Sequence, residues 1–156
     1  MWLLGVVVIA TVAAIALRRT RWAAPSRLVS RGAYVLLVLS PFFYFPLRSG
    51  FRLEPIACEW TFGPALAVHS LRNFPHIILF AFFFLLTYAQ LLDVKRALVW
   101  SAAACMAMGL LVEIAQGVTR AGHCRMRDLI PDAAGTLAGF LLVMTGRWLM
   151  RKAREA

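Results

Sequence analysis

Five long apolar stretches fill most of this chain, and the short segments between them carry most of its arginine and lysine residues. A helix needs about 20 largely apolar residues to cross the hydrocarbon core of a bilayer. Backbone polar groups find no water there, so such stretches cross as α-helices. The sequence therefore predicts an all-α integral membrane bundle of about five transmembrane helices, over residues 2–17, 33–47, 75–92, 97–116 and 129–146.

The composition excludes a soluble globular domain. Of 156 residues, 62% are hydrophobic and 15% are charged, against roughly one quarter charged residues in soluble domains. Five short-looped spans leave no room for a second domain, so we expect residues 1–156 to form one membrane domain. The net charge of +10 would suggest nucleic-acid binding in a soluble protein, but these basic residues flank apolar stretches, where lipid phosphates lie. We expect no nucleic acid as partner, and expect the bilayer, anionic lipid or glycolipid headgroups and other membrane proteins.

The first two stretches and the basic residues set the expected topology. Arg18, Arg19 and Arg21 follow the first stretch where a signal-peptide cleavage site would lie, which indicates an uncleaved anchor. The second stretch holds Pro41 and Pro46, so a kinked or partly re-entrant segment stays open. With the N-terminus outside, 11 of the 17 basic residues fall in cytoplasmic segments and six in outer loops. Because lysine and arginine are retained in the cytoplasm, we expect an N-out, C-in orientation.

Polar residues inside the last three stretches gather near the non-cytoplasmic face. His76 begins the third stretch, Glu113 and Gln116 end the fourth, and Asp128 and Asp132 begin the fifth. Because successive helices run in opposite directions, all five lie at one depth, and Glu113 and Gln116 share a helical face. A carboxylate in hydrocarbon must be protonated, paired or wet. We expect these residues to converge in one pocket, although a network that only ties helices together stays open as the structural alternative.

The stripe below Asp128 predicts close helix packing. Asp128, Asp132, Gly135 and Gly139 lie on one face of the fifth helix. Glycines four residues apart allow a neighbouring backbone to approach closely. We therefore expect Gly135 and Gly139 to face another helix, either the third or the fourth.

The loop before the fifth stretch is basic and ends at a helix N-terminus. Arg120, Arg125 and Arg127 lie where phosphate and carboxylate groups bind readily, and ordinary pairing with lipid headgroups is an equal alternative. An imidazole at His76 with nearby carboxylates suits a divalent ion. Tight ligand spacing such as His-Glu-x-x-His does not occur, however, so the sequence predicts no metal site and no cofactor.

The three cysteines differ in their expected surroundings. Cys105 lies in the fourth stretch and is expected to be an apolar packing residue. Cys58 and Cys124 both lie in loops on the side expected to be oxidising. A disulfide that clamps the long loop over residues 48–74, which we expect to lie on the membrane as a lid, and two free thiols are both open.

In chain order, the polar and glycine positions are His76, Glu113, Gln116, Asp128, Asp132, Gly135 and Gly139. This pattern, over about residues 73–139, resembles the VanZ-like family. The family usually has a basic residue where this chain has Asn73, a Gly-Arg pair where Gly122 and His123 stand, and an asparagine at Asp132. The resemblance implies a divergent, small, multi-spanning envelope protein of the bacterial cytoplasmic membrane. Its namesake is associated with low-level resistance to the glycopeptide teicoplanin, and the family has no settled reaction.

These observations favour recognition of a lipid-linked, glycolipid or glycopeptide-like envelope component at the outer-leaflet end of the bundle. If the chain is an enzyme, His76 or Glu113 acts as general base, Asp128 orients it, and the arginines of the 120–127 loop stabilise a developing anion. The sequence names no nucleophile. A non-catalytic accessory subunit of a membrane complex is the first alternative. A small transporter is the second, and is less favoured because the polar residues collect at one end.

Overall fold

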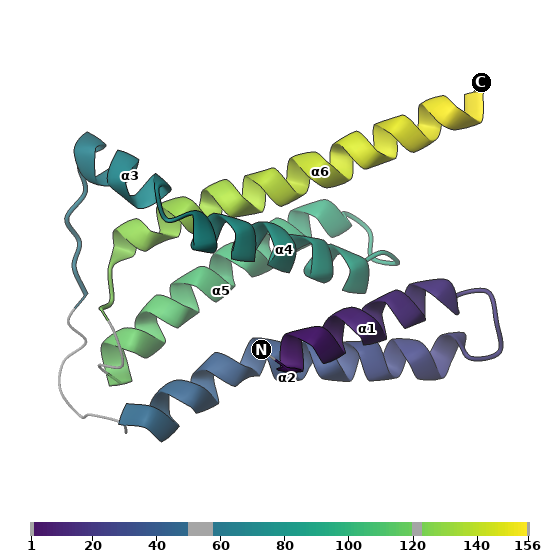
Figure 1. The fold of residues 1–156 in the computed structure, drawn as a ribbon, viewed down its shortest axis with the longest axis horizontal. Helices are drawn as coiled ribbons and strands as arrows, with labels where there is room; N and C mark the ends of the chain where they lie inside the picture. The colour runs from purple at the N-terminus through teal and green to yellow at the C-terminus, as the bar shows by residue number, and fades with distance from the viewer. Residues whose placement is uncertain (1, 50–57, 120–122, 156) are drawn as a thin grey trace.

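A computed structural model describes residues 2–49, 58–119 and 123–155 (Figure 1). These residues form helices joined by turns, which confirms the all-α membrane bundle. The elements are α1 (Trp2–Ala16), α2 (Ala23–Ser49), α3 (Pro64–Leu71), α4 (Phe74–Gln90), α5 (Ala97–Thr119), the short 3₁₀ turn η1 (Met126–Asp128) and α6 (Leu129–Glu155).

Not every apolar helix is long enough to cross a bilayer by itself. In the described part, α2, α5 and α6 with η1 are long and apolar enough, and α3 and α4 make a fourth if this bent pair counts as one span. The 15 residues of α1 rise about 22 Å at about 1.5 Å per residue, less than the ~30 Å hydrocarbon core. Of the five expected spans, three are therefore helices long enough to cross alone, α4 reaches that length only together with α3, and α1 is shorter than an average bilayer.

Helix α2 begins at Ala23, well before the expected start at residue 33, and continues through both internal prolines. Its early start is compatible with Pro25, because a proline in the first helical turn removes no intrahelical hydrogen bond. Further along, Pro41 has no N–H for the carbonyl of Leu37. The hydroxyl of Ser40 donates to that carbonyl at 2.8 Å instead, which lets the helix proceed.

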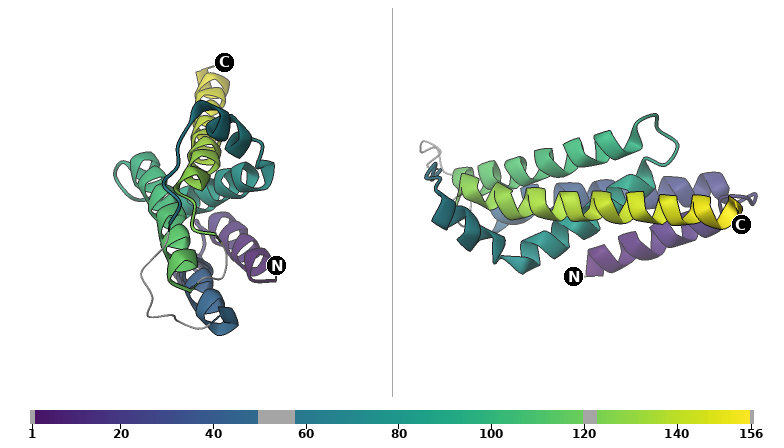
Figure 2. Two further views of the ribbon diagram at one scale, coloured as in Figure 1. Left: turned by 90° about the vertical axis from the view of Figure 1, so that its left-hand side faces the viewer. Right: turned by 90° about the horizontal axis from the view of Figure 1, so that it is seen from above.

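The centre of the molecule is formed by α4, α5 and α6, with the α1–α2 hairpin beside them (Figures 1 and 2). Phe80, Phe84 and Cys105 form the buried core of this centre. Large apolar side chains are exposed on all the long helices, Leu36 and Leu141 among them. In a bilayer such side chains contact lipid, so the low burial of these helices is what membrane insertion requires.

The expected lid contains a helix that the sequence analysis did not predict. Helix α3 follows Gly63, begins with Pro64 and meets α4 at an angle of 68°. It packs against α6 and η1, so it covers the start of α6. Residues 50–57 of the same loop lie outside the described residues.

The connections sort into two ends (Figure 1). The α1–α2 turn, the α4–α5 turn and the C-terminal end of α6 lie at one end, and α3 and the start of α6 lie at the other. Arg18 and Arg27 both pair with Asp93, which joins the α1–α2 hairpin to the α4–α5 turn. The basic segments expected in the cytoplasm therefore share an end, while the side of the membrane they face stays a prediction.

Membrane-impermeant thiol labelling tests that orientation. In a variant without Cys105, a cysteine introduced beside Arg125 should react in intact cells, and one introduced beside Lys95 should react only after the membrane is opened. The reason is that the Lys95 end carries the excess of retained positive charge. The opposite labelling pattern would show a C-out protein.

Candidate functional site

Two helix starts meet through a histidine and an aspartate. His76 lies in the first turn of α4 and Asp132 in the first turn of α6. His76 Nδ1 and Asp132 Oδ1 are 3.0 Å apart, with 3% of the Asp132 side chain and 37% of the His76 side chain exposed. When the ring is neutral and Nδ1–H donates to this carboxylate, Nε2 is left as a hydrogen-bond acceptor. The residue that holds His76 is therefore Asp132, whereas the sequence suggested Asp128.

A glycine on α5 makes the space for this carboxylate. A Cβ atom at Gly109 would lie 2.7 Å from Asp132 Oδ2, closer than real Cβ contacts, and 3.2 Å from Leu129 Cδ2, which is a tight contact. Sequence reasoning missed Gly109. The signal that could have found it is spacing, because Gly109 stands four residues before Glu113 and so lies on the same face of α5.

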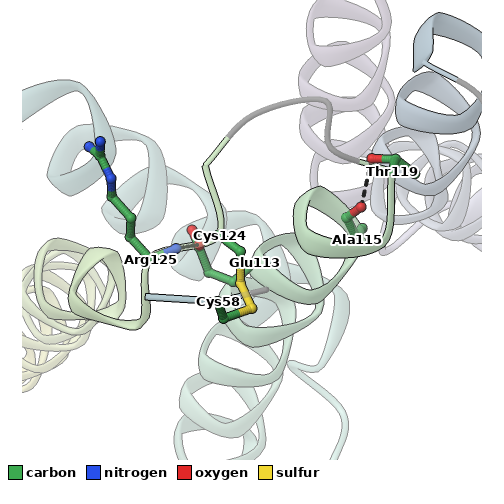
Figure 3. The surroundings of a disulfide bond; sticks show 6 residues. All are labelled: Cys58, Glu113, Ala115, Thr119, Cys124 and Arg125. Carbon is green, nitrogen blue, oxygen red and sulfur yellow. Dashed lines mark hydrogen bonds between the residues drawn. A yellow bond between two sulfur atoms is a disulfide. The ribbon is translucent and has the colours of Figure 1, made fainter. Parts of the chain in front are cut away.

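Glu113 is the third member of the site and is 2% exposed. Its Oε2 accepts a hydrogen bond of 2.7 Å from the backbone N–H of Arg125 (Figure 3). Glu113 also interacts electrostatically with His76, Asp128 and Asp132. We call these four residues, His76, Glu113, Asp128 and Asp132, the acid–histidine cluster.

The remaining polar candidates of α5 and η1 are placed less centrally. Gln116 lies one turn beyond Glu113 and is partly buried, and its side chain forms no hydrogen bond with another described residue. Asp128 closes η1 directly before α6, and its N–H donates to the Arg125 carbonyl at 2.9 Å. Asp128 therefore acts on the cluster through its charge.

A covalent and hydrogen-bonded tie holds the backbone that contacts Glu113. Cys58 and Cys124 form a disulfide with Cα atoms 4.7 Å apart. The Glu59 N–H donates to the Cys124 carbonyl at 2.9 Å, and the Met126 N–H donates to the Glu59 carbonyl at 3.1 Å. Figure 3 shows the disulfide beside Glu113 and Arg125. Of the two alternatives left open by the sequence, the structure thus contains the bridge.

The arginines of this loop pair with a carboxylate whose role was not predicted. Arg127 Nη1 lies 2.7 Å from Glu59 Oε1, and Arg125 Nε lies 3.4 Å from Glu59 Oε2. The Thr61 hydroxyl, which donates to Glu59 at 2.6 Å, and these arginines hold the pKa of Glu59 below its ordinary value. The carboxylate therefore stays ionised at neutral pH, and its pairs weaken only as the pH falls through that lowered pKa. Arg120, the third expected arginine, lies outside the described residues.

Gly135 and Gly139 press α6 against α4. A Cβ atom at Gly135 would lie 2.8 Å from Phe80 Cβ, and one at Gly139 would lie 2.8 Å from both the Ala81 carbonyl oxygen and Phe84 Cβ. The neighbour of the glycine stripe is thus the third apolar stretch. This close approach brings the starts of both helices together, which is what lets His76 reach Asp132.

The cluster offers hydrogen-bond acceptors and one imidazole rather than a metal-binding set. Across residues 2–49, 58–119 and 123–155, no group of three or more histidine, cysteine or acidic side chains lies close enough to hold a metal ion. One carboxyl group, that of Asp132, pairs with the partly exposed His76 ring, and those of Glu113 and Asp128 act on it electrostatically. Such a site can accept hydrogen bonds from a donor-rich ligand or move a proton at His76 Nε2.

Comparison with known proteins agrees with the motif pattern. The model of the VanZ/LLP1 family matches residues 2–150 of the chain. No curated protein and no solved structure matches it.

Proposed function

We propose, from the premise that this multi-pass membrane protein belongs to the VanZ/LLP1 family, that the acid–histidine cluster binds a lipid-linked envelope component. The component meets the cluster at the outer face of the bacterial cytoplasmic membrane. The observation that carries this proposal is the buried Asp132 carboxylate holding a partly exposed His76 at the end of the bundle.

The chemistry of the cluster favours a headgroup rich in hydrogen-bond donors. Glu113, Asp128 and Asp132 supply acceptor oxygens, and burying carboxyl groups in a bilayer is costly unless donors meet them. Sugar hydroxyls and peptide N–H groups, as in a glycolipid or a glycopeptide-like molecule, are such donors. A phosphate that links the headgroup to its lipid would meet Arg125, which uses Nε for Glu59 and is 39% exposed.

A link to teicoplanin-type resistance belongs to this proposal. A protein that binds a lipid-linked cell-wall component, or the lipid-bearing glycopeptide itself, at the outer leaflet changes how much antibiotic reaches its target. Expression of the chain in a susceptible Gram-positive host should therefore raise the minimum inhibitory concentration of teicoplanin.

We expect His76→Ala to abolish the rise in teicoplanin resistance while the folded yield stays unchanged. Binding of the lipid-linked component should weaken by about tenfold or more, because a hydrogen bond to a charged or polarised group is lost. Resistance assays and ligand titration of the purified proteins measure the two effects. His69→Ala is the matched control, since His69 is an exposed histidine of α3.

The same series separates a binding site from a structural network. Loss of the folded protein in His76→Ala, Glu113→Ala and Asp128→Ala alike would identify the cluster as a helix-packing device of an accessory subunit. Full activity in all three variants would remove the proposed site.

The His76–Asp132 hydrogen bond also favours a second candidate function, acid–base catalysis on the bound headgroup. His76→Asn distinguishes it from binding, because an asparagine amide can donate to Asp132 from the position of Nδ1 but cannot accept a proton in place of Nε2. Binding that persists in His76→Asn while the lipid product disappears from mass spectra would establish catalysis. If the unsubstituted protein leaves the lipid profile unchanged, catalysis is excluded and binding is the function that remains.

A further inference from the structure

A second polar centre lies at the end of the bundle opposite the acid–histidine cluster. Gln90, the last residue of α4, donates from Nε2 to Ser30 Oγ of α2 at 2.9 Å and to Thr11 Oγ1 of α1 at 3.0 Å. Thr11 and Ser30 are buried. The three side chains thus form a neutral, hydrogen-bonded network that joins three helices.

A cavity of about 30 Å³ lies beside this network, lined by α1, α2 and the α4–α5 turn. Its charged lining residues are Arg18, Arg27, Arg31 and Asp93. Three guanidinium groups against one carboxylate leave an excess of two positive charges. The volume corresponds to roughly two water molecules, so it admits the oxygens of a small oxyanion rather than a large polar ligand. We call this site the basic cavity.

Asp93 shows how an oxyanion fits between the arginines. Arg18 pairs with Oδ1 of Asp93, and Arg27 Nη1 lies 3.5 Å from Oδ2. Each guanidinium has five N–H donors, so these contacts leave most donors unused. Arg31, one turn beyond Arg27 on α2, pairs with no residue in the part of the chain that the structure describes. The basic cavity therefore has both donors and charge to hold another anion.

We propose that the basic cavity binds a phosphate group, carried either by a phospholipid headgroup or by free inorganic phosphate. Guanidinium groups match phosphate oxygens in geometry and form strong charge-assisted hydrogen bonds with them. The two sources share this chemistry and differ in the remainder of the ligand. Because the site lies at the opposite end from His76, it is independent of the function proposed above.

Calorimetric titration of the full-length protein in a non-ionic detergent tests the site. One arm uses dihexanoyl phosphatidylglycerol and the other uses inorganic phosphate. We expect saturable binding in at least one arm, and Arg31→Gln should weaken it by about tenfold or more. Arg151→Gln is the matched control, because it removes the same charge from an exposed position near the end of α6. Binding that is tighter for the lipid identifies a headgroup, and binding that is as tight for inorganic phosphate identifies the free ion.

A second pair of variants tests the Asp93 carboxylate, which competes with phosphate for Arg18 and Arg27, and the expected change in affinity has the opposite sign. Asp93→Asn should tighten phosphate binding, because it frees Arg18 and Arg27, whereas Glu155→Gln removes the same charge elsewhere and should change little. No saturable binding in either arm would overturn the proposal. Equal weakening by Arg31→Gln and Arg151→Gln would also overturn it, since the effect would then be general charge rather than a site.

Discussion

Replacing Gly139 with leucine is expected to cost at least a few kcal/mol of folding free energy and to remove most of the folded protein. A side chain here would meet the Ala81 carbonyl oxygen at 2.8 Å from its first carbon. That oxygen belongs to the backbone of α4, so relief requires the whole helix to move, and overpacking of this kind costs about 1–3 kcal/mol or more. Moving α4 away from α6 would also break the His76–Asp132 contact. Folded yield and the denaturant midpoint in detergent measure the loss.

The same helix provides the control. A Cβ atom at Gly146 meets nothing within 4 Å, so Gly146→Leu adds the same side chain on the lipid-facing side and removes a poor helix former. It should unfold at or above the midpoint of the unsubstituted protein. Equal midpoints for Gly139→Leu and Gly146→Leu would refute the packing role of the glycine stripe.

Removing the disulfide is expected to produce the second large loss. Cys58 and Cys124 are 66 residues apart, and closing a loop of this length contributes about 4 kcal/mol in the chain-entropy account. The double variant Cys58→Ser and Cys124→Ser should unfold at a clearly lower denaturant concentration. Binding of the proposed lipid-linked component should weaken as well, because the Arg125 N–H would no longer be held on Glu113.

Reduction of the unsubstituted protein by a membrane-impermeant phosphine should reproduce this loss, while the double variant should not respond to the reagent. Peptide mass mapping under non-reducing conditions gives a direct check. Free thiols at both Cys58 and Cys124 in active protein would show that the bridge does not stabilise the site.

The sequence was informative about depth and helical face, and less so about which side chains touch. His76, Glu113 and Asp132 could be placed at one end because helix order and alternation determine depth. The choice between Asp128 and Asp132 as the partner of His76 depends on how α6 rotates about its axis. That rotation is set by the contact of Gly135 and Gly139 with α4. A stripe of small residues in a sequence does not indicate which helix packs against it, so the rotation could not be predicted.

Loops and helix ends were predicted least well, for separate physical reasons. The start of α2 at Ala23 was not predicted, because its first turns are not uniformly apolar. Hydrophobic patterning indicates which residues contact lipid and does not give the full length of a helix. The pairing of Glu59 with Arg125 and Arg127 joins two loops that are distant in sequence and meet at the disulfide, so hydrophobic patterning could not indicate it. Helix α3 has eight residues, too few for a periodic pattern to stand out from the aromatic and apolar residues around it.

The position of Cys105 decides how the disulfide is selected. Cys105 is closer in sequence to Cys124 than Cys58 is, so loop-closure entropy alone would favour a bridge between Cys105 and Cys124. The structure buries Cys105 completely in the helix core, beside Phe80 and Phe84. Once α5 enters the bilayer, this thiol is withdrawn from oxidants and from thiolate exchange, which need access to water. Insertion of α5 into the membrane thus excludes both pairings that involve Cys105, and Cys58–Cys124 is the disulfide that remains.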